Sequence, residues 1–186
     1  MNKDYSLANR PGDLGQTVLI DSTTTKGSLR VCTYGEVDEL NCFVGWVKTA
    51  SLNRPMINGQ LIKIQRDLFV IGSQLATTRI ENTKFKIEKS SIKRLEEEIK
   101  AMETDLPELR RFILPGGCEL SSRLHIARGI CRRTERAVNK LNETEEIDEK
   151  IKTYLNRLSD WFFIAARIEN FASKTLETQW EPEKQA

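Results

Sequence analysis

The sequence predicts an all-α fold, an antiparallel bundle of about five helices that follows an extended N-terminal arm. Apolar residues recur at spacings of three and four from about residue 34 onward, which is typical of helices with one buried face. Short stretches rich in proline, glycine and polar residues interrupt this pattern, as expected for tight connections between antiparallel helices. The first 33 residues lack the pattern and carry turn-forming residues instead.

These observations suggest one domain with three parts. A chain of 186 residues has the length of a single domain. Residues 1–33 are expected to form the arm, residues 34–177 the helical bundle and residues 178–186 a loose polar tail.

The first three helices follow from their apolar stripes. Valine and leucine at helical spacing predict a helix over residues 34–51, which Asn53-Arg54-Pro55 ends. A second stripe between residues 61 and 75 predicts the next helix, and a shorter helix is expected over residues 90–103.

The two remaining helices follow the segment Phe112-Ile113-Leu114-Pro115-Gly116-Gly117, an apolar stretch that ends in a turn. They are expected over residues 119–142 and 146–176. The fourth helix has an apolar face formed by Ile126, Ala127, Ile130, Cys131, Ala137, Val138 and Leu141. The opposite face holds His125, Arg128, Arg132, Glu135 and Arg136, with Arg133 at its flank.

Two interpretations of this arginine-rich face remain open. It fits a solvated surface stitched together by ion pairs, and it also fits an anion site, because arginines on one stripe can bind a polyphosphate through forked hydrogen bonds. For His125, the only histidine of the chain, a packing role is favoured over a catalytic one.

Two other helices carry polar faces with one unusual residue each. On the fifth helix, Phe163 lies among polar residues, which suggests the wall of a ligand cavity or an oligomer interface. On the first helix, Gly45 shares a face with Asp38 and Asn41 and indicates a close approach by another element. Asp38 fits either a first-turn acid or the partner of an arginine elsewhere.

The arm contains the pattern G-D-x-G-x-T over residues 12–17. Glycines let backbone N–H groups approach phosphate oxygens, and Thr17 adds a hydroxyl donor. The pattern is not a Walker A loop, because no G-K-[ST] follows, and taken alone it also fits an ordinary surface turn.

Composition excludes several classes of function. Lys and Arg number 29 and Asp and Glu 27, and this near balance argues against a dedicated nucleic-acid-binding module. No apolar run approaches the roughly 20 residues of a membrane span, and no secretory signal is recognisable, so a cytoplasmic protein with free thiols is expected. The chain has a single histidine, so neither a mixed Cys/His zinc site nor a Ser-His-Asp triad is expected.

Taken together, the sequence resembles the PduO-type ATP:corrinoid adenosyltransferases over most of its length. The resemblance rests on five ordered blocks: Gly12 to Thr17; Arg30 with Tyr34 to Asn41; Phe112 to Gly117; Leu124 to Arg128 with Cys131 to Arg136; and Leu155 to Asp160.

The resemblance implies a homotrimer with ATP at the subunit interfaces, magnesium held by the ATP phosphates rather than by the protein alone, and a reductase as electron donor. Asp38 would pair with Arg128 across the interface, and Phe112 and Phe163 would line the corrinoid side. The implied ATP site comprises Arg10, Gly12, Asp13, Gly15, Gln16, Thr17, Lys26, Arg132, Arg133, Glu135, Arg136 and Asn156.

The activity that the resemblance implies is transfer of the 5′-deoxyadenosyl group from ATP to the cobalt of a reduced corrinoid, with Arg132, Asp38, Arg128 and Phe112 as the residues that support the chemistry. The alternative is a non-catalytic ATP or corrinoid sensor of the same fold. It is motivated by Asn9, Pro11 and Leu14, where the arm departs from the usual T-K-x-G-D-K-G of the family.

Overall fold

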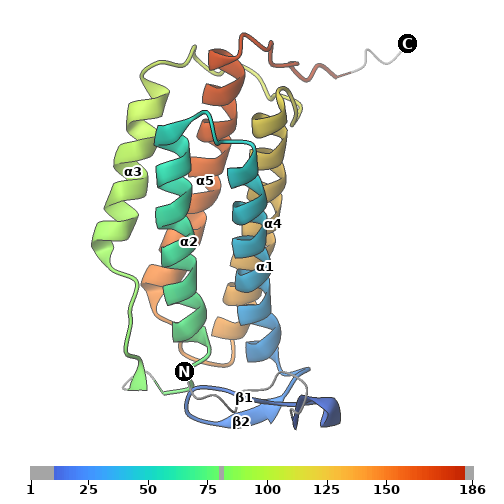
Figure 1. Ribbon diagram of the computed structural model, residues 1–186, viewed down its shortest axis with the longest axis vertical. Coiled ribbons are helices and arrows are strands. Elements are labelled where there is room, and N and C mark those ends of the chain that lie inside the picture. Colours follow the sequence, from blue (N-terminus) through green and yellow to red (C-terminus); the bar gives the residue numbers. More distant parts are fainter. Residues whose placement is uncertain (1–10, 80–81, 183–186) are drawn as a thin grey trace.

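The computed structural model describes residues 11–79 and 82–182. In these ranges five α-helices run antiparallel, and a small hairpin crosses below the ends of the first two (Figure 1). The predicted all-α bundle is confirmed. The helices are α1 (Leu29–Thr49), α2 (Pro55–Leu75), α3 (Lys89–Glu103), α4 (Glu119–Asn142) and α5 (Glu149–Ala172).

Part of the region expected to lack regular structure forms a hairpin. A short 3-10 turn, η1 (Pro11–Leu14), leads into β1 (Gln16–Val18), which pairs antiparallel with β2 (Thr23–Thr25). The arm therefore ends at Ser28 and not at residue 33. The Ser28 Oγ accepts a hydrogen bond from the Val31 N–H and caps α1, which begins five residues before the predicted start.

The early start of α1 was missed because its first buried positions are polar. Arg30 and Thr33 are buried, so the apolar stripe is absent there. The Arg30 guanidinium donates to the carbonyls of Leu75 (2.7 Å) and Thr77 (3.0 Å) and forms an ion pair with Glu145. It thus joins the start of α1 to the C-terminal end of α2.

The core lies among α1, α2, α4 and α5, with α3 packed on α5. Trp161, Phe162 and Tyr154 are fully buried there and form part of the apolar face of α5. That helix is shorter than expected, because the Asp148 side chain caps it by accepting from the Lys150 N–H (2.9 Å) and it ends at Ala172.

The predicted faces of α4 need one correction. Ile126 is 45% exposed, whereas His125, placed on the polar face, is only 6% exposed. Because α4 packs on both α1 and α5, its buried arc extends toward α5, where His125 meets Phe163, and Ile126 turns outward.

The C-terminal tail is also better ordered than expected. The Leu114 N–H donates to the Thr178 carbonyl and the Trp180 N–H to the Phe112 carbonyl, both at 2.8 Å. These bonds pair residues 178–180 with the strand-like segment before α4.

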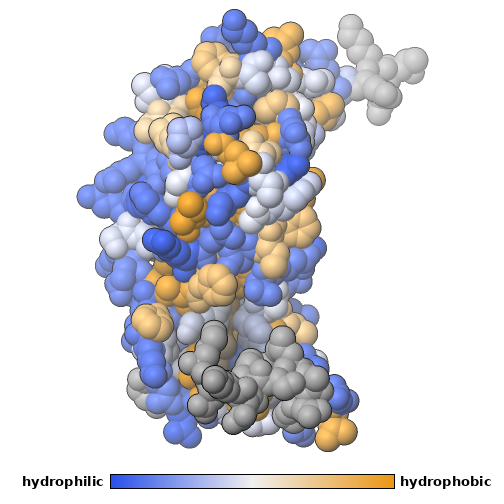
Figure 2. Space-filling model, in the orientation of Figure 1, coloured by the Kyte–Doolittle hydropathy of each residue, from blue (hydrophilic) through white to orange (hydrophobic). Residues whose placement is uncertain are grey.

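The surface is predominantly polar on the face seen in Figure 2, where hydrophobic side chains are scattered among hydrophilic ones. Within the described ranges, no helix has the length and apolar character needed to cross a bilayer.

Candidate active site

The arm builds a small cradle in which a tight glycine turn lies beside a cation. Gly15 has a φ of 73°, a left-handed conformation that favours glycine, and its carbonyl accepts from the Lys26 N–H at 2.8 Å. A Cβ at Gly12 would lie 2.9 Å from the Lys26 Nζ, so the ammonium rests against the glycine backbone. Asp13, Gln16 and Thr17 line the same turn and strand. A glycine turn with an adjacent ammonium group suits phosphate oxygens.

Arg132 and Arg136 form the second cationic element. They lie one turn apart on α4, and both side chains are exposed. Neither makes an ion pair with a carboxylate among the described residues. Beside them, the Asn156 Nδ2 on α5 donates to the Glu135 Oε1 at 3.1 Å. The structure therefore brings together four of the predicted ATP-site residues on one α4–α5 surface.

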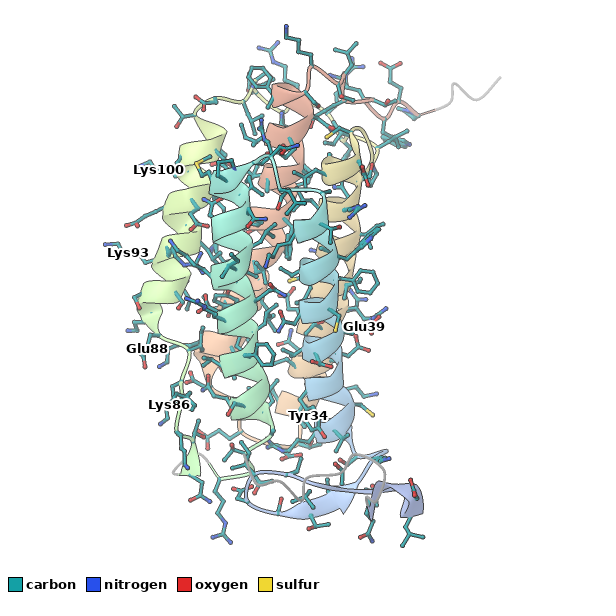
Figure 3. The ribbon with its side chains drawn as sticks, in the orientation of Figure 1. Tyr34, Glu39, Lys86, Glu88, Lys93 and Lys100 are labelled. Atoms are coloured by element: carbon teal, nitrogen blue, oxygen red, sulfur yellow. The ribbon has the colours of Figure 1, made fainter. Side chains whose placement is uncertain are left out.

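Arg133 lies in a different environment. Its guanidinium contacts Glu36 (2.7 Å) and Glu39 (2.5 Å) on α1, and the hydrogen bonds that it donates to these carboxylates raise the pKa of Arg133. Figure 3 shows Glu39 projecting from α1 on the side of α4. Arg133 thus joins two helices and is not grouped with Arg132. Arg10 lies outside the described residues.

A ring and two basic residues meet where α4 faces α5. The His125 and Phe163 rings are 6.2 Å apart, and the Arg128 guanidinium lies 5.7 Å from the Phe163 ring centroid. Neither ring nitrogen of His125 has a hydrogen-bond partner among the described residues. Burial, and then the charge of Arg128, lowers the pKa of His125 to about 4. His125 is therefore neutral at physiological pH, which suits a packing residue.

Asp38 lines a separate groove of about 410 Å³ between α1 and α2. The groove is also lined by Tyr34, Asn41 and the exposed side chain of Phe69, and Figure 3 places Tyr34 at the end of α1 near the hairpin. Asp38 is exposed and forms no ion pair with Arg128 within the described part of the chain. One subunit therefore leaves the two residues on separate surfaces.

The close approach predicted at Gly45 is confirmed. A Cβ there would lie 3.3 Å from the Gln65 Nε2 of α2. The Gln65 amide also donates to the Asn41 carbonyl at 3.3 Å, while the Asn41 Nδ2 donates to the Gln65 carbonyl at 3.4 Å. This reciprocal pair fixes α1 against α2 at the edge of the groove, which Asn41 also lines.

Phe112 is exposed and belongs to the segment between α3 and α4, which lies at the opposite end of the bundle from the hairpin (Figure 1). It lines an open hollow of about 760 Å³ with Trp180 and Leu109. A neighbouring hollow of about 630 Å³ is lined by Phe163 and Asp160, and Leu109 belongs to both. The two predicted corrinoid-side rings thus border adjoining hollows. Trp180 was missed by the sequence analysis because the tail carries no periodic signal.

Comparison with known proteins agrees with this geometry. The cobalamin adenosyltransferase family model matches residues 7–169. The corrinoid adenosyltransferase of Bacillus subtilis (strain 168) is 44% identical over 178 residues, covering 94% of this chain and 92% of the relative. The cobalamin adenosyltransferase of Cupriavidus metallidurans is 36% identical over 186 residues, covering 100% and 99%.

Solved structures give the same result. A variant of the PduO-type ATP:corrinoid adenosyltransferase from Lactobacillus reuteri, complexed with ATP, superposes with a TM-score of 0.87 at 40% identity, covering 92% of this chain and 98% of the other. A second variant of that enzyme, complexed with cobalamin and ATP, also gives 0.87, at 38% identity, covering 92% and 97%. With its helical bundle and this similarity along nearly its whole length, the chain belongs to the cobalamin adenosyltransferase family.

Proposed function

We propose that the protein transfers the 5′-deoxyadenosyl group from ATP to the cobalt of a reduced corrinoid and releases triphosphate. The observation that carries this proposal is the pair of exposed arginines, Arg132 and Arg136, beside the Asn156–Glu135 hydrogen bond in a chain of this family. Two guanidinium groups one turn apart can bind adjacent phosphates through charge-assisted hydrogen bonds.

The arm, which ends at Ser28, acts in this proposal as the nucleotide-binding part of the chain. The Gly12–Lys26 cradle supplies an ammonium group held against a glycine turn. The α4–α5 surface supplies the arginines, Glu135 and Asn156. The two elements together surround a triphosphate with positive charge.

The proposed assembly is a homotrimer in which the arm of one subunit covers the α4–α5 surface of the next. Two features support it. The groove of Asp38 has exposed apolar walls, including Ile20 and Phe69, that a second subunit would cover. Arg128 has a buried Nε without a partner among the described residues, and a carboxylate such as Asp38 of a neighbour would satisfy it.

The chemistry needs alignment and charge stabilisation and no proton transfer. A cobalt electron pair forms the bond to the ribose 5′ carbon, while the bond from that carbon to the triphosphate oxygen breaks and its electron pair leaves with the triphosphate. Arg132, Arg136 and Lys26 stabilise the charge that grows on the leaving group. A neutral, buried His125 is compatible with a reaction that uses no imidazole base.

Magnesium would be carried by the ATP phosphates, where it would neutralise leaving-group charge. No group of three or more His, Cys, Asp or Glu side chains in the described ranges could hold a metal ion. Phe112 and Phe163 would contact the corrinoid substrate, because both rings line hollows open to solvent. A reductase would supply the electrons for the corrinoid, and the four free thiols suit a reducing cytoplasm.

An anaerobic assay with ATP, magnesium and chemically reduced cobalamin tests the proposal. Formation of the cobalt–carbon bond, followed by its absorption spectrum, and equimolar triphosphate are the expected products. Binding of ATP and cobalamin without turnover, by protein that is folded, would instead indicate a sensor.

A further inference from the structure

The tip of the arm hairpin is tied to the end of α2 by one carboxylate. The Asp21 Oδ1 accepts from the backbone N–H and the hydroxyl of Thr78, both at 2.9 Å. The Oδ2 accepts from the Arg79 N–H at 3.0 Å and from the Asn82 Nδ2 at 3.1 Å. All four partners are donors, so the side chain is used entirely as an ionised acceptor.

Backbone contacts reinforce this attachment. The Ile20 N–H donates to the carbonyl of Ala76 at 3.0 Å, and Leu19 is 5% exposed. The Leu19 N–H donates to the Ser22 carbonyl at 2.8 Å and closes the turn that presents Asp21. The hairpin tip is therefore built to dock on the residues that follow α2.

The hairpin has a second attachment at its base. From the end of β2 the chain continues through Lys26 to Ser28, the cap of α1. β1 has only three residue pairs with β2, and its open end carries Gly15 and the turn that contains Gly12. If the tip were released, the hairpin could pivot about its connection to α1, and the cradle would lose its fixed position relative to the bundle.

We propose that Asp21 is a positioning residue for ATP: by clamping the hairpin tip to Thr78, Arg79 and Asn82, it fixes the orientation of the Gly12–Lys26 cradle. The inference rests on the proposed function, since it assumes that the cradle holds phosphate. It assigns Asp21 no contact with nucleotide.

The chemistry of the clamp predicts a strict requirement for a carboxylate. Backbone and side-chain donors, the Thr78 N–H first among them, hold the pKa of Asp21 well below its usual range, so the group remains ionised at physiological pH. In Asp21→Asn, the new amide NH₂ would face a donor on one side of the clamp, and only one oxygen would remain to accept.

The test compares Asp21→Asn with Thr23→Ala, a control at an exposed position of the same hairpin. Hydrogen exchange of the backbone amides of residues 16–25, without nucleotide, reports the clamp directly. Asp21→Asn should exchange about tenfold faster there, and its ATP dissociation constant and ATP KM should rise about tenfold. The corrinoid KM and kcat at saturating ATP should stay within about twofold of wild type, and Thr23→Ala should resemble wild type throughout.

Unchanged exchange and unchanged ATP affinity in Asp21→Asn would overturn the proposal. An equal loss in both substrates and in melting temperature would also overturn it, because it would indicate general damage to the fold. Should Asp21→Asn fail to fold, Thr78→Val, which removes the hydroxyl donor and keeps the backbone N–H, gives the same comparison with a smaller expected shift. If wild type shows no adenosyl transfer, the proposed function fails, while exchange and ATP binding still decide the role of Asp21.

Discussion

A substitution at Phe112 distinguishes two roles for its ring, contact with the corrinoid and packing within the fold. The side chain is 80% exposed, so Phe112→Ala removes little buried surface. Burying a whole phenylalanine contributes about 1.5–3 kcal/mol, and one fifth of that is about 0.3–0.6 kcal/mol. For a chain of this size such a loss lowers the melting temperature by about 1–2 °C. A buried phenylalanine would instead cost about 3–5 kcal/mol.

The expected phenotype is therefore a folded protein with a corrinoid defect. Phe112→Ala should keep the ATP KM of wild type and lose most turnover when Co(II) corrinoid must be reduced on the protein. Turnover should recover largely when Co(I) is supplied directly. Absorption spectra of bound Co(II) should show a species without its lower ligand in wild type and lack it in the variant.

The matched control is Phe85→Ala, which removes a ring that is 64% exposed in the segment before α3. Its stability loss should be similarly small and its activity that of wild type. The reasoning is refuted if Phe112→Ala shows the same four-coordinate Co(II) species as wild type. It is also refuted if the variant melts many degrees lower, since the exposed ring would then have an unrecognised packing role.

Three further results are expected from the same structure. Arg132→Ala should lose about 2–4 kcal/mol of transition-state stabilisation, measured through kcat/KM. Arg133→Ala breaks only exposed ion pairs and should leave turnover near wild type, so equal effects of the two substitutions would contradict the proposed ATP site. A double-mutant cycle of Asp38→Ala and Arg128→Ala should show coupling of about 1 kcal/mol or more in activity, and additivity would mean that the residues do not meet. The pKa of His125 is lowered from 6.5 to about 4, so the folded state binds fewer protons than the unfolded state between these pH values. The free energy of unfolding should therefore fall as the pH drops from about 6.5 toward 4. The same pH dependence in His125→Gln as in wild type would count against this.

Periodicity predicted the bundle well wherever burial is apolar. The fourth helix was expected over residues 119–142, and α4 spans those residues. The start of α1 was misplaced because Arg30 and Thr33 are buried through hydrogen bonds, which a hydrophobic pattern cannot register. The end of α5 was extended too far for the opposite reason, since apolar Leu176 continues the pattern but is 92% exposed beyond the helix.

The sequence predicted which residues form the candidate site, but it predicted their arrangement in space only in part. The glycines of the arm predicted a turn, and the structure has a turn there in which Lys26 lies against Gly12. Phosphate binding by this turn stays a prediction. The hairpin was not foreseen, because a run of three threonines between glycines has no alternating apolar face. Asp21 gave no signal at all, since its four donors come from residues 57 to 61 positions away.

The arginines show most clearly what sequence spacing cannot decide. Arg132 and Arg133 are neighbours on α4, yet Arg133 is held by two carboxylates of α1 while Arg132 has none within the described residues. Arg30, which belongs to the same family pattern, forms an ion pair with Glu145 and donates hydrogen bonds to two backbone carbonyls. A guanidinium that already holds a carboxylate has fewer free N–H donors to offer a phosphate, and this separates Arg132 from Arg133 and Arg30. The partners come from other helices, so the distinction becomes visible only when the helices are packed together.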